Sequence, residues 1–156
     1  MNRRQALIAA LGSAVLPFRF GKSAGACLTP VGVNNSSDTE VQTLFQKELP
    51  DLQKGDNTVS LSVLRVQYAP GGESRPHSHP VPVFVYILRG SIESQVEGER
   101  ARRYMAGEFF FEDARGKHLV ARNASSTEPA EFLAVFVGNA KLPLASPLSA
   151  EDGSRP

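Results

Sequence analysis

Apolar and polar residues alternate along short stretches in the middle of this chain. Between residues 57 and 68, Val59, Leu61 and Val63 alternate with serines. Successive side chains on a strand point to opposite faces, so this pattern is typical of a strand with one buried face. A continuous apolar run at 83–88 has the length of a buried strand and ends at Arg89-Gly90.

Strands are expected at 41–46, 57–68, 83–88, 91–97, 108–111, 118–122 and 131–137. Residues that favour turns separate them, and the two strands that flank Gly90 are expected to form a hairpin. No stretch between 57 and 137 shows the 3.6-residue period of an amphipathic helix. The pattern therefore predicts an all-β fold, either a sandwich or a barrel.

The strand expected at 83–88 has two apolar faces. Val83, Val85 and Ile87 should point inward, whereas Phe84, Tyr86 and Leu88 should point outward. An apolar outer face needs a cover, and a second subunit is the natural one. We therefore expect a homodimer.

Length and charge restrict the possible organisation and partners. A chain of 156 residues has room for one domain. The formal net charge is +1, and the basic residues are scattered among acidic ones. A nucleic-acid-binding protein would concentrate them in a patch or stripe, so no nucleic-acid partner is expected.

The N-terminus has the features of an export signal. Arg3 and Arg4 precede a modest apolar run at 6–16, and Ala24-Gly25-Ala26 offers a small-residue cleavage site. The paired arginines are typical of twin-arginine export, which predicts a periplasmic or secreted bacterial protein. The alternative is an N-terminal tail on a cytoplasmic protein. The apolar run is shorter than the roughly 20 residues of a membrane span, so none is expected.

These features divide the chain into four parts. We expect a signal peptide at 1–26, a polar linker at 27–39, a β-barrel at 40–140 and a flexible, proline-containing tail at 141–156. Cys27 is the only cysteine, so no disulfide can form within the chain. The sequence leaves open whether Cys27 is lipidated.

The three histidines are the strongest chemical signal. His77 and His79 alternate, so on a strand both would point to one face, and His118 lies on another expected strand. Imidazole is the commonest metal ligand, so His77, His79 and His118 predict a site for one divalent transition metal. The alternatives are a surface pair at His77 and His79 and a hydrogen-bonded barrel histidine at His118.

The spacing of these histidines resembles that of the small single-domain cupins of the cupin type 2 group. Gly71, five further residues, His77 and His79, and then Gly90 match the first cupin motif, and Gly107 to His118 matches the second. The resemblance implies a jelly-roll β-barrel that binds metal through the three histidines. One departure concerns Val83, which occupies the position of a glutamate that completes the metal centre in the family.

The missing glutamate affects the expected chemistry. The resemblance then implies a site similar to the three-histidine centres of cupin dioxygenases, in which a small-molecule substrate supplies the anion. Glu112 could offer an oxygen, although the family pattern puts it at the barrel mouth. The sequence does not choose among iron, manganese, nickel, copper and zinc. The alternative function is a non-catalytic small-molecule-binding or sensor protein.

Overall fold

A computed structural model of the chain describes residues 38–52 and 55–149. The expected signal peptide at 1–26 and nearly all of the expected linker at 27–39 lie outside the described residues. No helix among the described residues is long and apolar enough to cross a membrane.

The described residues form ten strands and one short 3₁₀ helix. The elements are β1 (Thr39–Glu48), η1 (Pro50–Leu52), β2 (Val59–Tyr68), β3 (His77–Ser78), β4 (Val83–Arg89), β5 (Ser91–Val96), β6 (Arg102–Met105), β7 (Phe109–Glu112), β8 (Lys117–Asn123), β9 (Ala130–Asn139) and β10 (Ser146–Pro147). The prediction of an all-β fold is confirmed.

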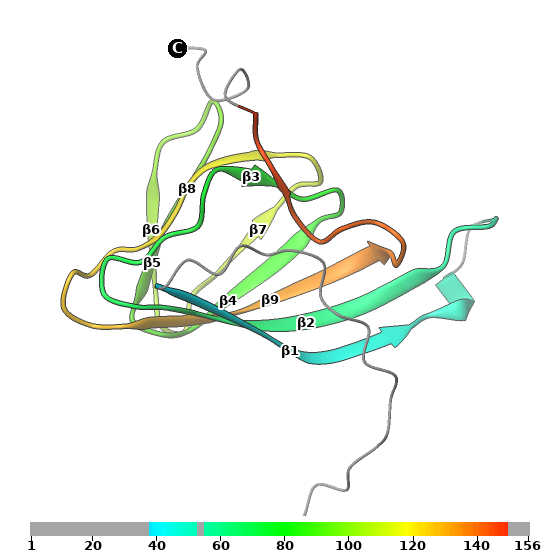
Figure 1. Ribbon diagram of the computed structural model, residues 1–156, viewed down its shortest axis with the longest axis horizontal. Helices are drawn as coiled ribbons and strands as arrows, with labels where there is room; N and C mark the ends of the chain where they lie inside the picture. The colour runs from blue at the N-terminus through cyan, green and yellow to red at the C-terminus, as the bar shows by residue number, and fades with distance from the viewer. Residues whose placement is uncertain (1–37, 53–54, 150–156) are drawn as a thin grey trace, which may run out of the picture.

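The strands form two five-stranded sheets that face each other (Figure 1). The first has the order β1-β2-β9-β4-β7 and the second the order β10-β3-β8-β5-β6, with antiparallel pairing throughout. The sheets approach each other near β5 and β6 and diverge toward the C-terminal end of β1, marked by its arrowhead (Figure 1). The space between them holds the core and the candidate site.

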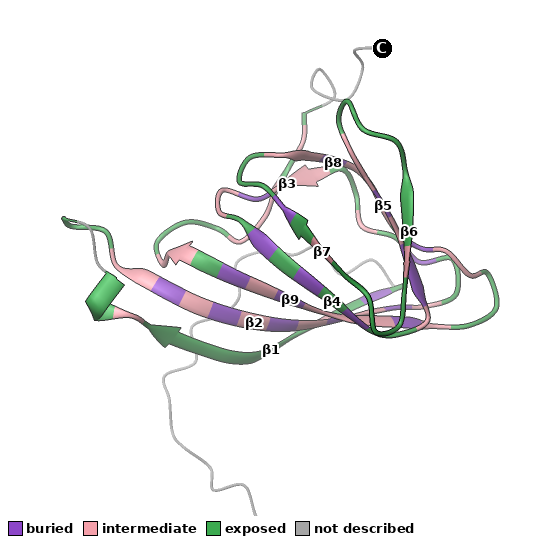
Figure 2. Cartoon of the chain, turned by 180° about the vertical axis from the view of Figure 1, so that it is seen from behind, coloured by how far each residue is buried: buried purple, intermediate pink, exposed green. Residues whose placement is uncertain are grey.

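The hydrophobic core follows from the alternating pattern of the strands. On β4, Val83, Val85 and Ile87 are at most 2% exposed, whereas Phe84 and Tyr86 are 39% and 38% exposed. Figure 2 shows this alternation as stripes along β4 and β2, while most of β1 is exposed. The predicted inward face of the strand at 83–88 is therefore confirmed.

The predicted hairpin about Gly90 is wrong. β4 pairs with β7 and β9 in the first sheet, whereas β5 pairs with β6 and β8 in the second. Gly90 has a φ of 72°, a left-handed conformation that glycine adopts without steric cost. It therefore marks a corner at which the chain passes between sheets, and a turn signal alone does not distinguish these two uses.

Residues 141–149, the described part of the tail expected at 141–156, are held against the barrel, and residues 150–156 lie outside the described residues. Ser146 and Pro147 form β10, which pairs with β3, and the Leu148 amide donates a hydrogen bond to the Pro76 carbonyl at 3.1 Å. A proline is tolerated here because β10 is an edge strand and need not donate on both sides. We call residues 140–149 the C-terminal strap.

Substitution of Gly90 tests the sheet corner. A Cβ atom at Gly90 would lie 2.7 Å from the Pro129 carbonyl oxygen, so Gly90→Ala adds a steric clash to the cost of the positive φ. We expect it to lower the free energy of unfolding by about 2–4 kcal/mol in urea titrations.

Gly98→Ala is the matched control. Gly98 also has a positive φ, of 81°, but a Cβ there would meet nothing within 4 Å. Only the backbone cost of about 1–2 kcal/mol should remain. Equal losses for the two variants would refute a close packing of the corner at Gly90.

Candidate metal centre

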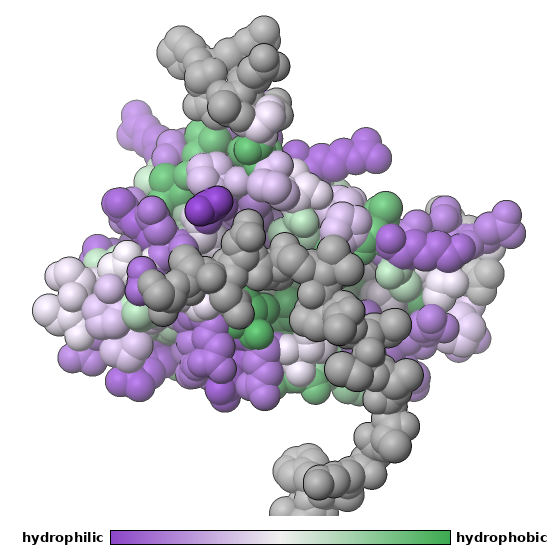
Figure 3. Space-filling view, viewed as in Figure 1, coloured by the Kyte–Doolittle hydropathy of each residue, from purple (hydrophilic) through white to green (hydrophobic). Residues whose placement is uncertain are grey.

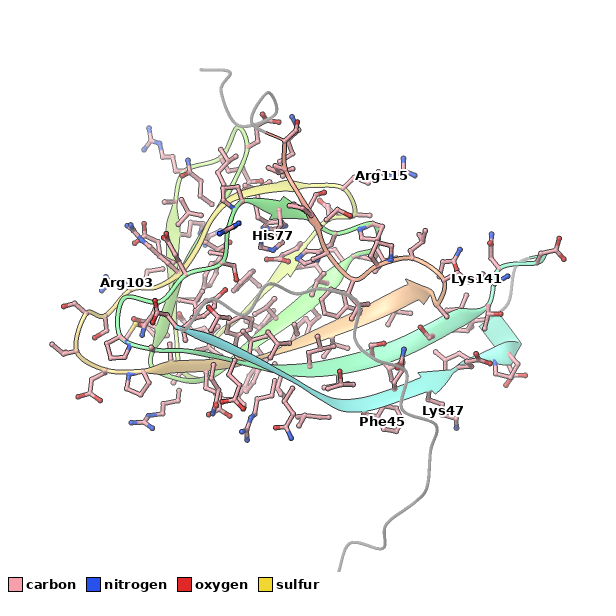
Figure 4. The ribbon with its side chains drawn as sticks, viewed as in Figure 1. Phe45, Lys47, His77, Arg103, Arg115 and Lys141 are labelled. Atoms are coloured by element: carbon pink, nitrogen blue, oxygen red, sulfur yellow. The ribbon has the colours of Figure 1, made fainter. Side chains whose placement is uncertain are left out.

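The three predicted histidines come together at one end of the space between the sheets. His77 on β3 and His118 on β8 are direct cross-strand partners, and their rings stack with centroids 5.4 Å apart. The ring centroid of His79 lies 4.8 Å from that of His77 and 5.3 Å from that of His118. His77, on β3, points toward the space between the sheets, whereas Arg103 and Arg115 point outward (Figure 4).

A fourth donor comes from Glu112 at the end of β7. Its carboxylate oxygens lie 3.4 Å from His79 Nε2 and 3.3 Å from His118 Nδ1. Glu112 is 8% exposed, so it lies inside the barrel. The position at the barrel mouth that the family pattern implied is therefore wrong. One donor atom each from His79, Glu112 and His118 fall within 4.8 Å of one another, an arrangement that could hold a metal ion.

The position of Glu112 compensates for Val83. The two residues are direct cross-strand partners in the β4–β7 pair, with both side chains on the inner face. The resemblance to cupins implies a carboxylate at the position of Val83, on β4. In this chain the carboxylate is supplied from the adjacent strand, at the same level of the sheet.

Backbone carbonyl groups fix two of the imidazoles. His77 Nδ1 lies 2.7 Å from the Arg75 carbonyl oxygen, and His79 Nδ1 lies 2.6 Å from that of Leu144 in the C-terminal strap. Because a carbonyl oxygen only accepts, each Nδ1 must carry the proton, which leaves each Nε2 with a free lone pair. This is the arrangement of imidazoles that bind metals.

Burial keeps the cluster neutral in the metal-free protein. Desolvation lowers the pKa of His79 to about 4 and, with the neighbouring imidazoles, that of His118 to about 3. Desolvation also raises the pKa of Glu112 to about 8. The carboxyl–imidazole contacts are therefore not ion pairs at neutral pH. Both ring nitrogens of His118 are buried without a hydrogen-bond partner, which indicates a site built for a further group.

The turn between β7 and β8 holds the cluster together. It joins Glu112 to His118, and the Arg115 amide within it donates a hydrogen bond of 2.6 Å to the His79 carbonyl. Arg115 has a φ of 67°, an unfavourable conformation for a residue with a side chain. The hydrogen bond gives a structural reason for this conformation, because it ties the turn to His79.

A cavity of about 300 Å³ adjoins the centre. His77, His79 and Glu112 form part of its wall, and most of the remainder is apolar, including Leu64, Val85 and Phe132. Such a cavity suits a small, largely apolar molecule. Charged and polar residues lie along the lower edge and both sides of this face of the molecule, and apolar residues reach the surface nearer its centre (Figure 3).

Sequence reasoning underrated Glu112, although a signal was present. On a strand that includes 109–112, Glu112 shares a face with Phe110, and Phe109 shares the other face with Phe111. Phe109 and Phe111 are each 62% exposed, so Phe110 and Glu112 face inward. The sequence alone does not say which of these two faces is buried.

Comparisons with known proteins agree with this geometry. Residues 64–136 match the family model described as a cupin domain. Germin-like protein subfamily 2 member 2 of Arabidopsis thaliana is 31% identical over 119 residues, 73% of this chain and 51% of that protein. Nectarin-1 of Nicotiana plumbaginifolia is 33% identical over 72 residues, 46% of this chain and 30% of that protein. The chain thus spans about half, or less, of these relatives.

A solved structure supports the same fold. A cupin-2 domain from Rhodospirillum rubrum superposes with a TM-score of 0.56 at 19% identity, over 78% of this chain and 76% of that one. At this identity the likeness concerns the fold alone. Together with the two facing sheets, it confirms the predicted jelly-roll β-barrel of cupin type.

The raised pKa of Glu112 predicts a pH dependence for the metal-free protein. A carboxyl group whose pKa rises from 4.5 to about 8 on folding contributes stability below pH 4.5, which is lost as the pH rises toward 8. Glu112→Gln removes this loss. In urea titrations with a chelator at pH 8, we expect the free energy of unfolding of Glu112→Gln to exceed that of the wild type by at least about 1 kcal/mol.

The histidines act on the opposite side of the pH range. The lowered pKa values of His79 and His118 contribute stability above pH 6.5. This stability is lost as the pH falls toward about 4 for His79 and about 3 for His118, and the loss should be equal in the wild type and Glu112→Gln. Glu128→Gln, at a mostly exposed carboxyl group, should leave the pH profile unchanged. Parallel profiles for the wild type and Glu112→Gln would show that Glu112 ionises normally.

Proposed function

We propose that this cupin-type barrel binds one divalent transition metal through His77, His79, His118 and Glu112, and that the metal acts on a small molecule in the adjoining cavity. The observation that carries the proposal is the buried group of His79, Glu112 and His118, with donor atoms within 4.8 Å of one another. His77 adjoins both histidine rings and has its Nδ1 already bonded.

The residues fit such an ion by charge as well as by position. Burial raises the pKa of Glu112, and the imidazoles beside it are neutral. No positive charge therefore offsets the ionised form of this carboxyl group in the metal-free cluster. A bound divalent ion would supply that charge and favour the ionised form. Three imidazoles and one carboxylate suit manganese, iron, nickel, copper or zinc, so the donor set leaves the choice of metal open.

The chemistry that we propose is oxidation of the small molecule by dioxygen. A redox-active metal held by these residues would supply Lewis acidity and electron transfer, as the resemblance to cupin dioxygenases implies. The chain itself supplies the apolar cavity wall, which excludes water and orients the substrate. The alternative is a non-catalytic binding or sensor protein that uses the same cavity.

We also propose that a second copy of the chain covers the outer face of the first sheet. Five residues that are successive cross-strand partners form an apolar row across all five strands of that face: Phe45, Val63, Val135, Phe84 and Phe111. Phe84 also packs against Phe109, with ring centroids 5.4 Å apart. Phe45 lies on the side of β1 that faces away from the second sheet (Figure 4).

The row favours a copy of itself as its cover. Phe45, Phe84 and Phe111 are 47%, 39% and 62% exposed, so a wide strip of apolar surface is available. The polar pair Arg65 and Glu131 borders the strip on the same sheet. Two sheet faces with a central apolar strip and a polar border can pack against each other about a two-fold axis.

Metal analysis tests the proposed centre. Chain purified without a histidine tag and incubated with manganese, iron or zinc should retain about one ion per chain, because the four donors converge. His118→Ala and Glu112→Ala should each weaken retention at least about tenfold. The matched control, Glu128→Ala, changes an exposed carboxyl group and should retain the wild-type amount.

Equal metal contents in the wild type and His118→Ala would contradict the proposed centre. Should the centre be confirmed, oxygen uptake with a panel of thiols, β-diketones and phenols separates an enzyme from a binding protein. No uptake with any of them would favour the binding protein.

Analytical ultracentrifugation tests the proposed dimer. Phe84→Glu and Phe111→Glu each place a charge in the apolar row, which costs several kcal/mol in a buried interface, so both should sediment as monomers. Arg103→Glu, on the second sheet, is the control and should remain dimeric. A wild-type chain that sediments as a monomer at about 100 μM, well above the micromolar dissociation constants of stable dimers, would contradict the proposal.

A further inference from the structure

The cavity wall contains a pair of hydroxyl groups apart from the proposed metal ligands. Tyr68, at the end of β2, and Ser74 both line the cavity, and their hydroxyl oxygens lie 2.6 Å apart. Tyr68 is only 2% exposed, and its ring packs edge-on against Phe132 with centroids 5.5 Å apart. This pair has no part in the metal centre as described above.

The pair has one hydrogen more than it uses. Two hydroxyl groups carry two hydrogens, and the bond between them takes one, whichever group donates. No other hydrogen bond of either side chain occurs within the described residues. Because both groups lie in the cavity wall, the second hydrogen is available to an acceptor inside the cavity. Burial raises the pKa of Tyr68 to about 12, so its hydroxyl group stays protonated at neutral pH.

The backbone holds this pair in a fixed position. The Ser74 amide donates to the Ala121 carbonyl on β8 at 2.9 Å, and Tyr68 pairs with Ala130 on β9. In the turn between them, Gly72 accepts a hydrogen bond from the Asn123 amide at 2.9 Å. A donor that is held before the ligand arrives loses little freedom on binding, which is a property of recognition groups.

We propose that the Tyr68–Ser74 pair recognises a neutral hydrogen-bond acceptor, such as a ketone oxygen, on a small and otherwise largely apolar ligand. The inference deepens the proposed function, on which it rests for the identity of the cavity as the ligand site. The apolar wall favours the body of such a ligand. The carboxylate of Glu73 in the same wall disfavours a second anionic group close to the pair.

The test uses two probes of nearly the same shape. Acetophenone carries a ketone oxygen, and α-methylstyrene has a CH₂ group in its place. Their dissociation constants are measured by NMR titration of the chain after removal of metal with a chelator, and again after loading with zinc. The ratio of the two constants isolates the contribution of the acceptor from that of the apolar ring.

The decisive variant is Tyr68→Phe/Ser74→Ala, which removes both hydroxyl groups and keeps the buried ring. We expect its ratio to shift about two- to tenfold against acetophenone, the range of one neutral hydrogen bond. Tyr86→Phe/Ser91→Ala makes the same two chemical changes at residues that do not line the cavity, a buried serine on β5 and a tyrosine on the outer face of β4. Its ratio should equal that of the wild type.

Two outcomes overturn the inference: an unchanged ratio in Tyr68→Phe/Ser74→Ala, or an equal shift in the control variant. The failure of the proposed function is seen separately, as a failure of the wild-type chain to take up zinc. Because the probes need no metal, the ratio in the metal-free chain decides the inference in either case.

Discussion

The candidate site depends on the cost of burying a carboxyl group beside neutral imidazoles. Glu112 has no cationic neighbour that favours its ionised form, and the nearby histidines are too buried to become cationic at neutral pH. Such a group reduces the stability of the metal-free fold at neutral pH. A cluster of this kind is understandable if a cation normally compensates it, so the same burial that weakens the empty barrel would strengthen the binding of an ion.

The rest of the architecture holds this cluster in place. The β3–β8 pair sets His77 opposite His118, the β4–β7 pair sets Glu112 opposite Val83, and the carbonyl of Leu144 orients His79. The donors therefore come from both sheets and from the segment that follows β3, and the C-terminal strap orients one of them. A change in the relative position of any of these parts would separate the donors. The donors therefore converge only when the two sheets and the strap are correctly packed.

The sequence predicted those features that depend on one strand at a time. Alternation at 57–68 and 83–88 predicted both strands and the buried face of the second, and the histidine spacing predicted which rings would meet. On β2 the buried face is the one with Ser60 and Ser62, and Val63 lies on the outer face, because Leu64 and Val66 further along the strand carry the core contacts. Features that depend on pairing between distant strands were not predictable from period alone. Gly90 marks a turn in either a hairpin or a sheet corner, and the partnership of Glu112 with Val83 requires the register of β4 against β7. The strap was missed for the same reason, because its order comes from a partner about 70 residues away.

The strap also bears on how this chain can be modified. Chain termini are usually convenient places for a fused tag or partner, because they tend to lie free at the surface. Here the Leu144 carbonyl accepts a hydrogen bond from Nδ1 of His79, a proposed ligand, so the strap helps to support the centre. A bulky fusion close behind Ser149 would pull on a segment that orients His79. The C-terminal strap therefore belongs to the interior of this barrel, beside the proposed centre.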